Sequence, residues 1–194
     1  PMISGSGIPQ VEAEISGYLK ADWLKTLLAK FAGGVICLFA GLSLGREGPS
    51  IQMGAMSGKG LSAVLHRNRT EEKYLMTCGA SAGLAAAFNA PLAGIMFALE
   101  EVHKNFSAYV LVPVMISSIV ADFLSKYIFG LSPVFHFSIE NPIPLQYYWM
   151  IIIFGVLVGF LGAGYNKVLF WVKDRFAKIK DTKFRLIPVF LLAG

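Results

Sequence analysis

The sequence contains few charged residues. Asp, Glu, Lys and Arg make up 15% of its 194 residues, whereas a typical soluble domain has about 25%. Hydrophobic residues make up 55%, and the mean hydropathy is +0.61. This shortage of charge excludes a disordered chain, a coiled coil and an ordinary soluble enzyme, and it indicates a protein surrounded mainly by lipid.

Cysteine and histidine are also scarce. The two cysteines, Cys37 and Cys78, lie inside apolar stretches without metal-ligand spacing, so we interpret them as small buried hydrophobic residues rather than as a disulfide. The three histidines, His66, His103 and His136, are too scattered to indicate a metal site. We therefore expect no metal, no resident cofactor and no conventional catalytic site.

Acidic residues are fewer than basic ones, 12 against 17, which gives a net charge of +5. The basic residues gather in short hydrophilic segments between apolar stretches, and not on a polar face interleaved with aromatics. This distribution is typical of the cytoplasmic loops of a membrane protein and not of a nucleic-acid partner. No signal peptide is recognised at the start, and residues 184–194 resemble an interrupted transmembrane helix, so we expect a piece of a longer membrane protein.

Five apolar stretches predict an all-α, multi-pass membrane protein, because a spanning helix needs about 20 apolar residues. The third stretch contains Asn89 and Pro91 at its middle, and proline there favours two shorter helices. The fifth is long enough to span with considerable tilt. The stretches are residues 23–44, 49–65, 74–99, 105–127 and 145–172.

The charges of the connecting segments predict their orientation. Residues 66–73 and 173–185 are rich in Lys and Arg, whereas residues 131–146 contain neither. By the positive-inside rule the first two segments face the cytoplasm and the third faces outside. We expect a multi-pass integral protein of the cell membrane. GxxxG pairs at Gly79/Gly83 and Gly155/Gly159 predict close helix packing.

Two short segments combine flexible glycine, a polar residue and a proline that suits the first turn of a helix. Each would leave unpaired backbone N–H groups at a helix start, where the helix dipole favours negative charge. In a soluble protein both would be capped loops, but inside a membrane such helix starts can hold anions. The first segment is Gly5, Ser6, Gly7, Ile8 and Pro9, and the second is Gly45, Arg46, Glu47, Gly48 and Pro49.

Three acidic residues are candidates for proton chemistry. Glu47 either caps its helix or competes with an anion, occupying the site when ionised and leaving it when protonated. Glu100 and Glu101 follow an uncharged stretch, and they belong either to a solvated helix end or to a proton entry on the cytoplasmic side.

The two glycine segments and residues 83–94 (GLAAAFNAPLAG), in this order and at these separations, resemble the CLC family of chloride channels and chloride/proton antiporters. The resemblance is dense over residues 1–102 and rests mainly on hydropathy as far as residue 194. It implies a dimeric inverted repeat of tilted, broken helices with one pore per subunit. Residues 1–194 would then form part of one transmembrane domain, the later part of the first repeat to about residue 140 and the start of the second over residues 145–194.

The same resemblance implies roles for individual residues. Ser6 would give its hydroxyl to a central chloride, and Glu47 would be the gating glutamate beside an outer site formed by the amides of residues 46–48. Glu101, or its neighbour Glu100, would be the internal proton-transfer acid that antiporters of the family carry. The family's third filter segment, of the GxFxP type, and its pore tyrosine do not occur here, so this chain alone does not enclose an anion pathway.

Three functions remain open from the sequence. The first is chloride/proton antiport, favoured by Glu101, and the second is a passive voltage- or proton-gated chloride channel. The third is an intramembrane enzyme that uses Glu47 and Glu101 as an acid/base pair, which requires the carboxylates to lie within about 10 Å of each other. We expect a larger separation and therefore no enzyme.

Overall fold

A computed structural model describes residues 2–42, 45–104, 106–130 and 144–177. The chain divides into two compact units, Pro1–Phe135 and His136–Gly194. Every regular element within the described residues is a helix, which confirms the predicted all-α class. Most of the loop over residues 131–146, and the residues after 177 of the segment 173–185, lie outside the described residues, so the predicted orientation stays a prediction.

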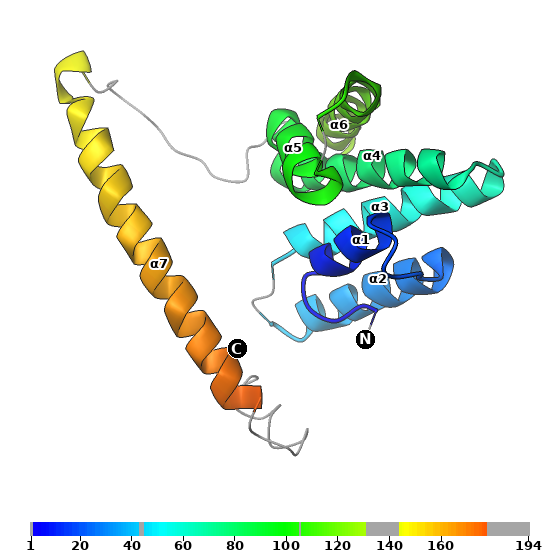
Figure 1. Ribbon diagram of the computed structural model, residues 1–194, viewed down its shortest axis with the longest axis horizontal. Coiled ribbons are helices and arrows are strands. Elements are labelled where there is room, and N and C mark those ends of the chain that lie inside the picture. The colour runs from blue at the N-terminus through cyan, green and yellow to red at the C-terminus, as the bar shows by residue number, and fades with distance from the viewer. Residues whose placement is uncertain (1, 43–44, 105, 131–143, 178–194) are drawn as a thin grey trace. The chain divides into compact units, whose positions relative to one another are not determined.

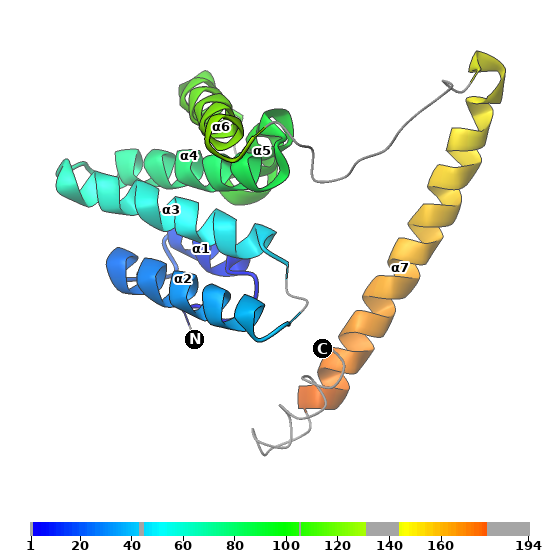
Figure 2. The ribbon, with the colours of Figure 1, turned by 180° about the vertical axis from the view of Figure 1, so that it is seen from behind.

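The first unit is built around a pair of helices, α3 and α4, that run side by side (Figure 1 and Figure 2). Helices α1 and α2 pack against α3, and α5 and α6 pack against α4. The elements of this unit are α1 (Ile8–Ile15), α2 (Trp23–Phe39), α3 (Glu47–Val64), α4 (Arg69–Phe88), α5 (Pro91–Phe97), the π-helix η1 (Ala98–His103) and α6 (Ala108–Phe129).

Local sequence signals fix several helix ends. Asp22 caps α2 by accepting hydrogen bonds of 3.2 Å from the backbone N–H groups of Leu24 and Lys25. Asn68 caps α4 within a capping box, which satisfies donors that the first turn leaves free. Helix α4 ends at Phe88, and α5 begins at Pro91. The predicted break of this stretch into two helices is therefore confirmed.

Close backbone contact joins α3 to α4. A Cβ atom at Gly54 or at Gly79 would collide with the carbonyl of the other residue, and a Cβ at Gly83 would collide with the carbonyl of Ser50. Glycine is needed here because any side chain would push the two helices apart. The close packing predicted for Gly79 and Gly83 is confirmed, and it places the start of α3 against the second half of α4.

Some boundaries differ from the sequence-based expectations. The helix expected over residues 23–44 ends at Phe39 and has 17 residues; at 1.5 Å per residue it is about 26 Å long, short of the roughly 30 Å of a bilayer core. The chain turns soon afterwards at Gly41, whose φ is +77°. Cys37 and Cys78 are free, as expected, but they are half-buried and therefore less buried than the sequence predicts.

In the second unit, η2 (Leu145–Tyr147) leads into α7 (Trp149–Ala177), and within that unit α7 packs on η2. A Cβ at Gly155 or Gly159 would meet no atom within 4 Å, so the helix packing predicted for this pair stays a prediction. By length and apolar composition, two helical segments of the described residues qualify as membrane spans, Ala108–Phe129 and Leu145–Arg175.

Candidate functional site

The first glycine segment turns sharply into α1. Gly5 and Gly7 have φ angles of +68° and +91°, in the left-handed region that glycine adopts without strain. Gly7 is the N-cap of α1, and Pro9 lies in its first turn, as the sequence predicts. The Ser6 hydroxyl oxygen accepts a 3.4 Å hydrogen bond from the backbone N–H of Ile8, so Ser6 stands at the electropositive start of α1.

A buried cation holds this segment in place. The side chain of Lys30, on α2, belongs to a residue only 6% exposed. Its Nζ donates hydrogen bonds of 3.1 Å to the carbonyl of Ile3 and 2.8 Å to that of Gly5. Because hydrogen bonds from a charged donor are stronger than neutral ones, α2 fixes the backbone that leads to Ser6.

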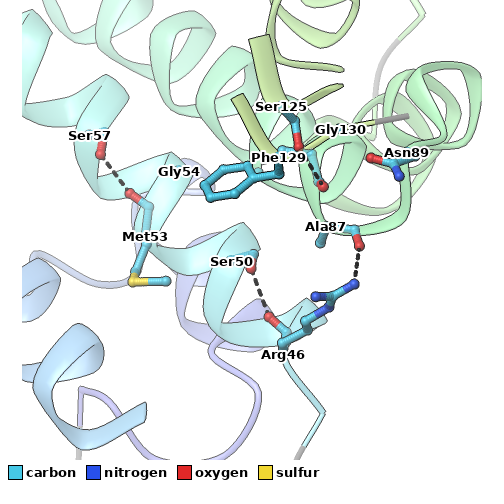
Figure 3. Close-up of a pocket in the computed structure, with 12 residues that line it drawn as sticks. Arg46, Ser50, Met53, Gly54, Ser57, Ala87, Asn89, Ser125, Phe129 and Gly130 are labelled. Carbon is cyan, nitrogen blue, oxygen red and sulfur yellow. Dashed lines mark hydrogen bonds between the residues drawn. The ribbon is translucent and has the colours of Figure 1, made fainter. Parts of the chain in front are cut away.

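The second segment opens α3 directly. Arg46 is the N-cap, Glu47 is the first helical residue and Pro49 the third. The Arg46 guanidinium donates a 3.1 Å hydrogen bond from Nη2 to the carbonyl of Ala87 at the end of α4 (Figure 3). The backbone carbonyl of Arg46 accepts a 2.8 Å hydrogen bond from the hydroxyl of Ser50.

The polar groups around Arg46 border an open hollow, and the Glu47 carboxylate lies beside the segment's first residue. A Cβ built on Gly45 would collide with Oε2 of Glu47, so this carboxylate folds back along the backbone before α3. The hollow has a volume of about 620 Å³ and is lined by residues of α3, α4 and α6 together with their ends (Figure 3). Its polar lining comes from Arg46, Ser50, Ser57, Asn89 and Ser125.

The two helix starts meet. Gly48 is buried, and a Cβ added to it would lie 2.7 Å from both the Cβ and the carbonyl oxygen of Ser6. One turn further along α3, the Gln52 side chain packs against Gly7 and donates a 2.8 Å hydrogen bond from Nε2 to the carbonyl of Met2. The starts of α1 and α3 therefore meet at Ser6 and Gly48, so two helix dipoles bring their positive ends close to each other. The anion-binding role of the ten residues stays a prediction.

Glu100 and Glu101 lie elsewhere. Both are exposed on η1, and Lys104, which follows η1, forms an ion pair with Glu12 on α1. The hydrogen bond that Lys104 donates to Glu12 raises the pKa of Lys104. Ser6 stands at one end of α1 and Glu12 lies in its second half, about 9 Å further along at 1.5 Å per residue. The described geometry thus brings Ser6 and the Glu47 segment together and leaves Glu101 at the other end of α1.

Sequence reasoning missed two residues of the site. Lys30 has a visible signal, because it is a charge in the interior of the apolar residues 23–44, whereas the other charge there, Lys25, lies near the start. Gln52 has none, since a glutamine in a moderately polar helix is ordinary until its position against Gly7 is known.

Comparisons with known proteins identify the family of the chain. The family model described as voltage gated chloride channel matches residues 1–194. The H(+)/Cl(−) exchange transporter ClcA of Vibrio parahaemolyticus is 37% identical over 199 residues, covering 100% of this chain and 43% of that protein. ClcA of Yersinia pestis bv. Antiqua is 34% identical, covering 100% of this chain and 42% of that protein.

A solved structure is also similar. The crystal structure of a slow cyanobacterial Cl−/H+ antiporter matches with a TM-score of 0.89 at 36% identity, covering 100% of this chain and 46% of that one. The chain belongs to the voltage-gated chloride channel family, whose members are integral membrane transport proteins and not enzymes. It spans less than half the length of these relatives.

Proposed function

We propose that the protein containing this chain exchanges chloride for protons across the cell membrane. The observation that carries this proposal is the contact of Ser6 with Gly48, which joins the starts of α1 and α3. Similarity to transporters and to an antiporter, each named for exchange of chloride and protons, supports the same function.

In this proposal the anion binds where the two helix starts meet. The Ser6 hydroxyl and the backbone N–H groups at the starts of α1 and α3 donate hydrogen bonds to chloride. Because dipoles and N–H groups stabilise negative charge without carrying a full positive charge, they bind the ion and still release it.

Glu47 provides the link to protons. As a carboxylate it carries the same charge as chloride and stands at the start of α3, so it competes with the anion for the same N–H groups. When it takes up a proton, it loses that charge and leaves the site to chloride. Alternation between the two states moves a proton in the direction opposite to chloride.

Glu101 supplies protons from the cytoplasmic side, with Glu100 as its immediate neighbour. Its position on η1, near the far end of α1 from Ser6, keeps the proton entry apart from the anion site. The substrates are chloride and protons, no resident cofactor takes part, and the whole protein is a multi-pass homodimer that completes the anion pathway.

The test is transport by the full protein in liposomes loaded with a chloride gradient. The wild-type protein should use the chloride gradient to move protons against their own gradient. Glu47→Gln should move chloride without protons. Glu101→Gln should also uncouple protons from chloride, but without opening the outer gate. Glu72→Gln, an acid paired with Arg69 at the start of α4, is the matched control and should exchange normally.

Two results would contradict the proposal. Proton transport that persists in Glu47→Gln would remove the assigned role of that residue. Chloride movement without any proton movement in wild type would identify a passive channel instead.

A further inference from the structure

The turn that carries Glu101 has an unusual backbone. Residues Ala98–His103 form a π-helix directly after α5, and the next residue, Lys104, has a φ of +56°. Single π turns inside α-helices are rare and are frequent at functional sites. A left-handed residue other than glycine is also disfavoured, so contacts from outside must hold this turn in shape.

One such contact joins the turn to α4. The imidazole Nδ1 of His103 lies 3.0 Å from the hydroxyl oxygen of Thr77, a residue with no exposed surface. The Thr77 hydroxyl donates its hydrogen to the carbonyl of Lys73 at 2.8 Å. Because a hydroxyl has one hydrogen, its oxygen must accept from His103, and His103 therefore carries its proton on Nδ1.

The surroundings of His103 restrict its ring further. The Tyr74 ring lies 5.6 Å from the imidazole, centroid to centroid, tilted by 44°. On the same π-helix Ala98, Leu99 and Val102 are buried, whereas Glu100 and Glu101 are exposed. His103 thus ties the buried side of the turn to α4 while the two acids remain accessible.

A second contact joins the turn to α1 through the ion pair of Lys104 and Glu12. Both partners are partly exposed, so this pair is the weaker of the two attachments. Helix α1 begins at Ile8, two residues after Ser6. The π turn is therefore held between α4 and the helix that opens at the proposed anion site.

We propose that His103 and Thr77 form a positioning pair that holds the π turn and so directs Glu101 for proton transfer. This inference rests on the proposed function. Hydrogen bonds in a π-helix span one more residue than in an α-helix, so a relaxation of the turn to α geometry rotates the side chains of Glu100 and Glu101. Proton transfer depends on distance and direction, and a small displacement lowers its rate strongly.

The first measurement needs no transport. Nitrogen-15 NMR of the full protein labelled in histidine should show His103 with a protonated Nδ1 in its neutral form. Thr77→Val removes the acceptor and should abolish or mix this tautomer. A His103 that is protonated on Nε2 in wild type would overturn the inference.

The second measurement is the ratio of proton to chloride flux in liposomes. Thr77→Val and His103→Phe, which keeps an aromatic ring beside Tyr74, should lower that ratio about fivefold, the factor that corresponds to one hydrogen bond of ~1 kcal/mol. The double variant should be no worse than either single variant, because both remove the same bond. Chloride flux should stay near the wild-type rate.

Controls separate positioning from a general loss of stability. His103→Asn places an amide N–H near the former Nδ1 and should restore the ratio. Thr70→Val changes an exposed threonine at the start of the same helix and should leave the ratio unchanged. The inference is wrong if Thr77→Val and His103→Phe keep the wild-type ratio of proton to chloride flux. It is also wrong if His103→Asn lowers that ratio as much as His103→Phe does. Wild type without proton coupling would instead refute the proposed function, whatever the tautomer.

Discussion

The two glycine segments have a similar residue pattern but are held by different forces. Residues 5–9 are fixed from outside, by the buried ammonium of Lys30 and by the amide of Gln52 against Gly7. Residues 45–49 are held partly by their own Arg46, which reaches the end of α4, and by the backbone contact of α3 with α4. The same local turn chemistry thus depends on different distant residues in each segment.

This difference shows what a sequence motif determines. Glycine and proline set the local backbone, and therefore a helix begins where the motif predicts. They do not set where that helix start lies in space. The Ser6–Gly48 contact exists because α2, α3 and α4 are packed so that both starts reach one point.

The largest expected effect breaks the contact between the segments. Gly48→Ala would place a methyl group 2.7 Å from the carbonyl oxygen of Ser6, and overpacking of this kind costs about 1–3 kcal/mol. We expect a lower midpoint of thermal unfolding and weaker chloride binding in the full protein. Gly33→Ala, where a Cβ meets nothing within 4 Å, is the control and should raise the midpoint, since alanine favours a helix. Equal behaviour of the two variants would contradict the contact.

The next largest effect is expected from a change that weakens the anchor of the first segment alone. Lys30→Met removes the hydrogen bond to Gly5 of the first segment and the one to Ile3 just before it, and it leaves the second segment intact. We expect chloride to bind about tenfold more weakly, or ~1.4 kcal/mol, as measured by calorimetry. Lys25→Met, on the same helix with a side chain 85% exposed, should bind normally. Wild-type affinity in Lys30→Met would show that the first segment needs no anchor.

The smallest effect distinguishes strain from function. Gly5 and Gly17 both have positive φ, and a Cβ on either meets nothing within 4 Å. Alanine at each position should therefore cost a similar amount of stability, about 1 kcal/mol. Only Gly5→Ala should also weaken chloride binding, because it alters the turn before Ser6. If Gly17→Ala weakened chloride binding as much as Gly5→Ala, the effect would come from backbone strain in general and not from the turn before Ser6.

Much of this fold follows from local signals in the sequence. The break between α4 and α5 follows from Asn89 and Pro91, and the tight contact of α3 with α4 follows from Gly79 and Gly83. Both are properties of a few neighbouring residues, which explains why they could be predicted.

Other features depend on residues far apart in the chain. The π turn at residues 98–103 is tied to Thr77 and Glu12 on other helices, and no local pattern indicates it. The early end of α2 at Phe39, by contrast, has a local signal that was missed: Gly41 follows the C-cap residue with a φ of +77°. Gly33 and Gly34 lie within the same helix, so a glycine in this stretch did not by itself mark the end. The role of Gln52 needs the position of Gly7, which only the packed helices provide.

Anomalous diffraction from crystals of the full protein grown with bromide tests the meeting of the two helix starts most directly. We expect a bromide peak within hydrogen-bonding distance of the Ser6 hydroxyl, with the Glu47 carboxylate displaced from the N–H groups that the ion occupies. A structure in which Ser6 and Gly48 are separated, or in which bromide binds elsewhere and this junction stays empty, would contradict the proposed anion site.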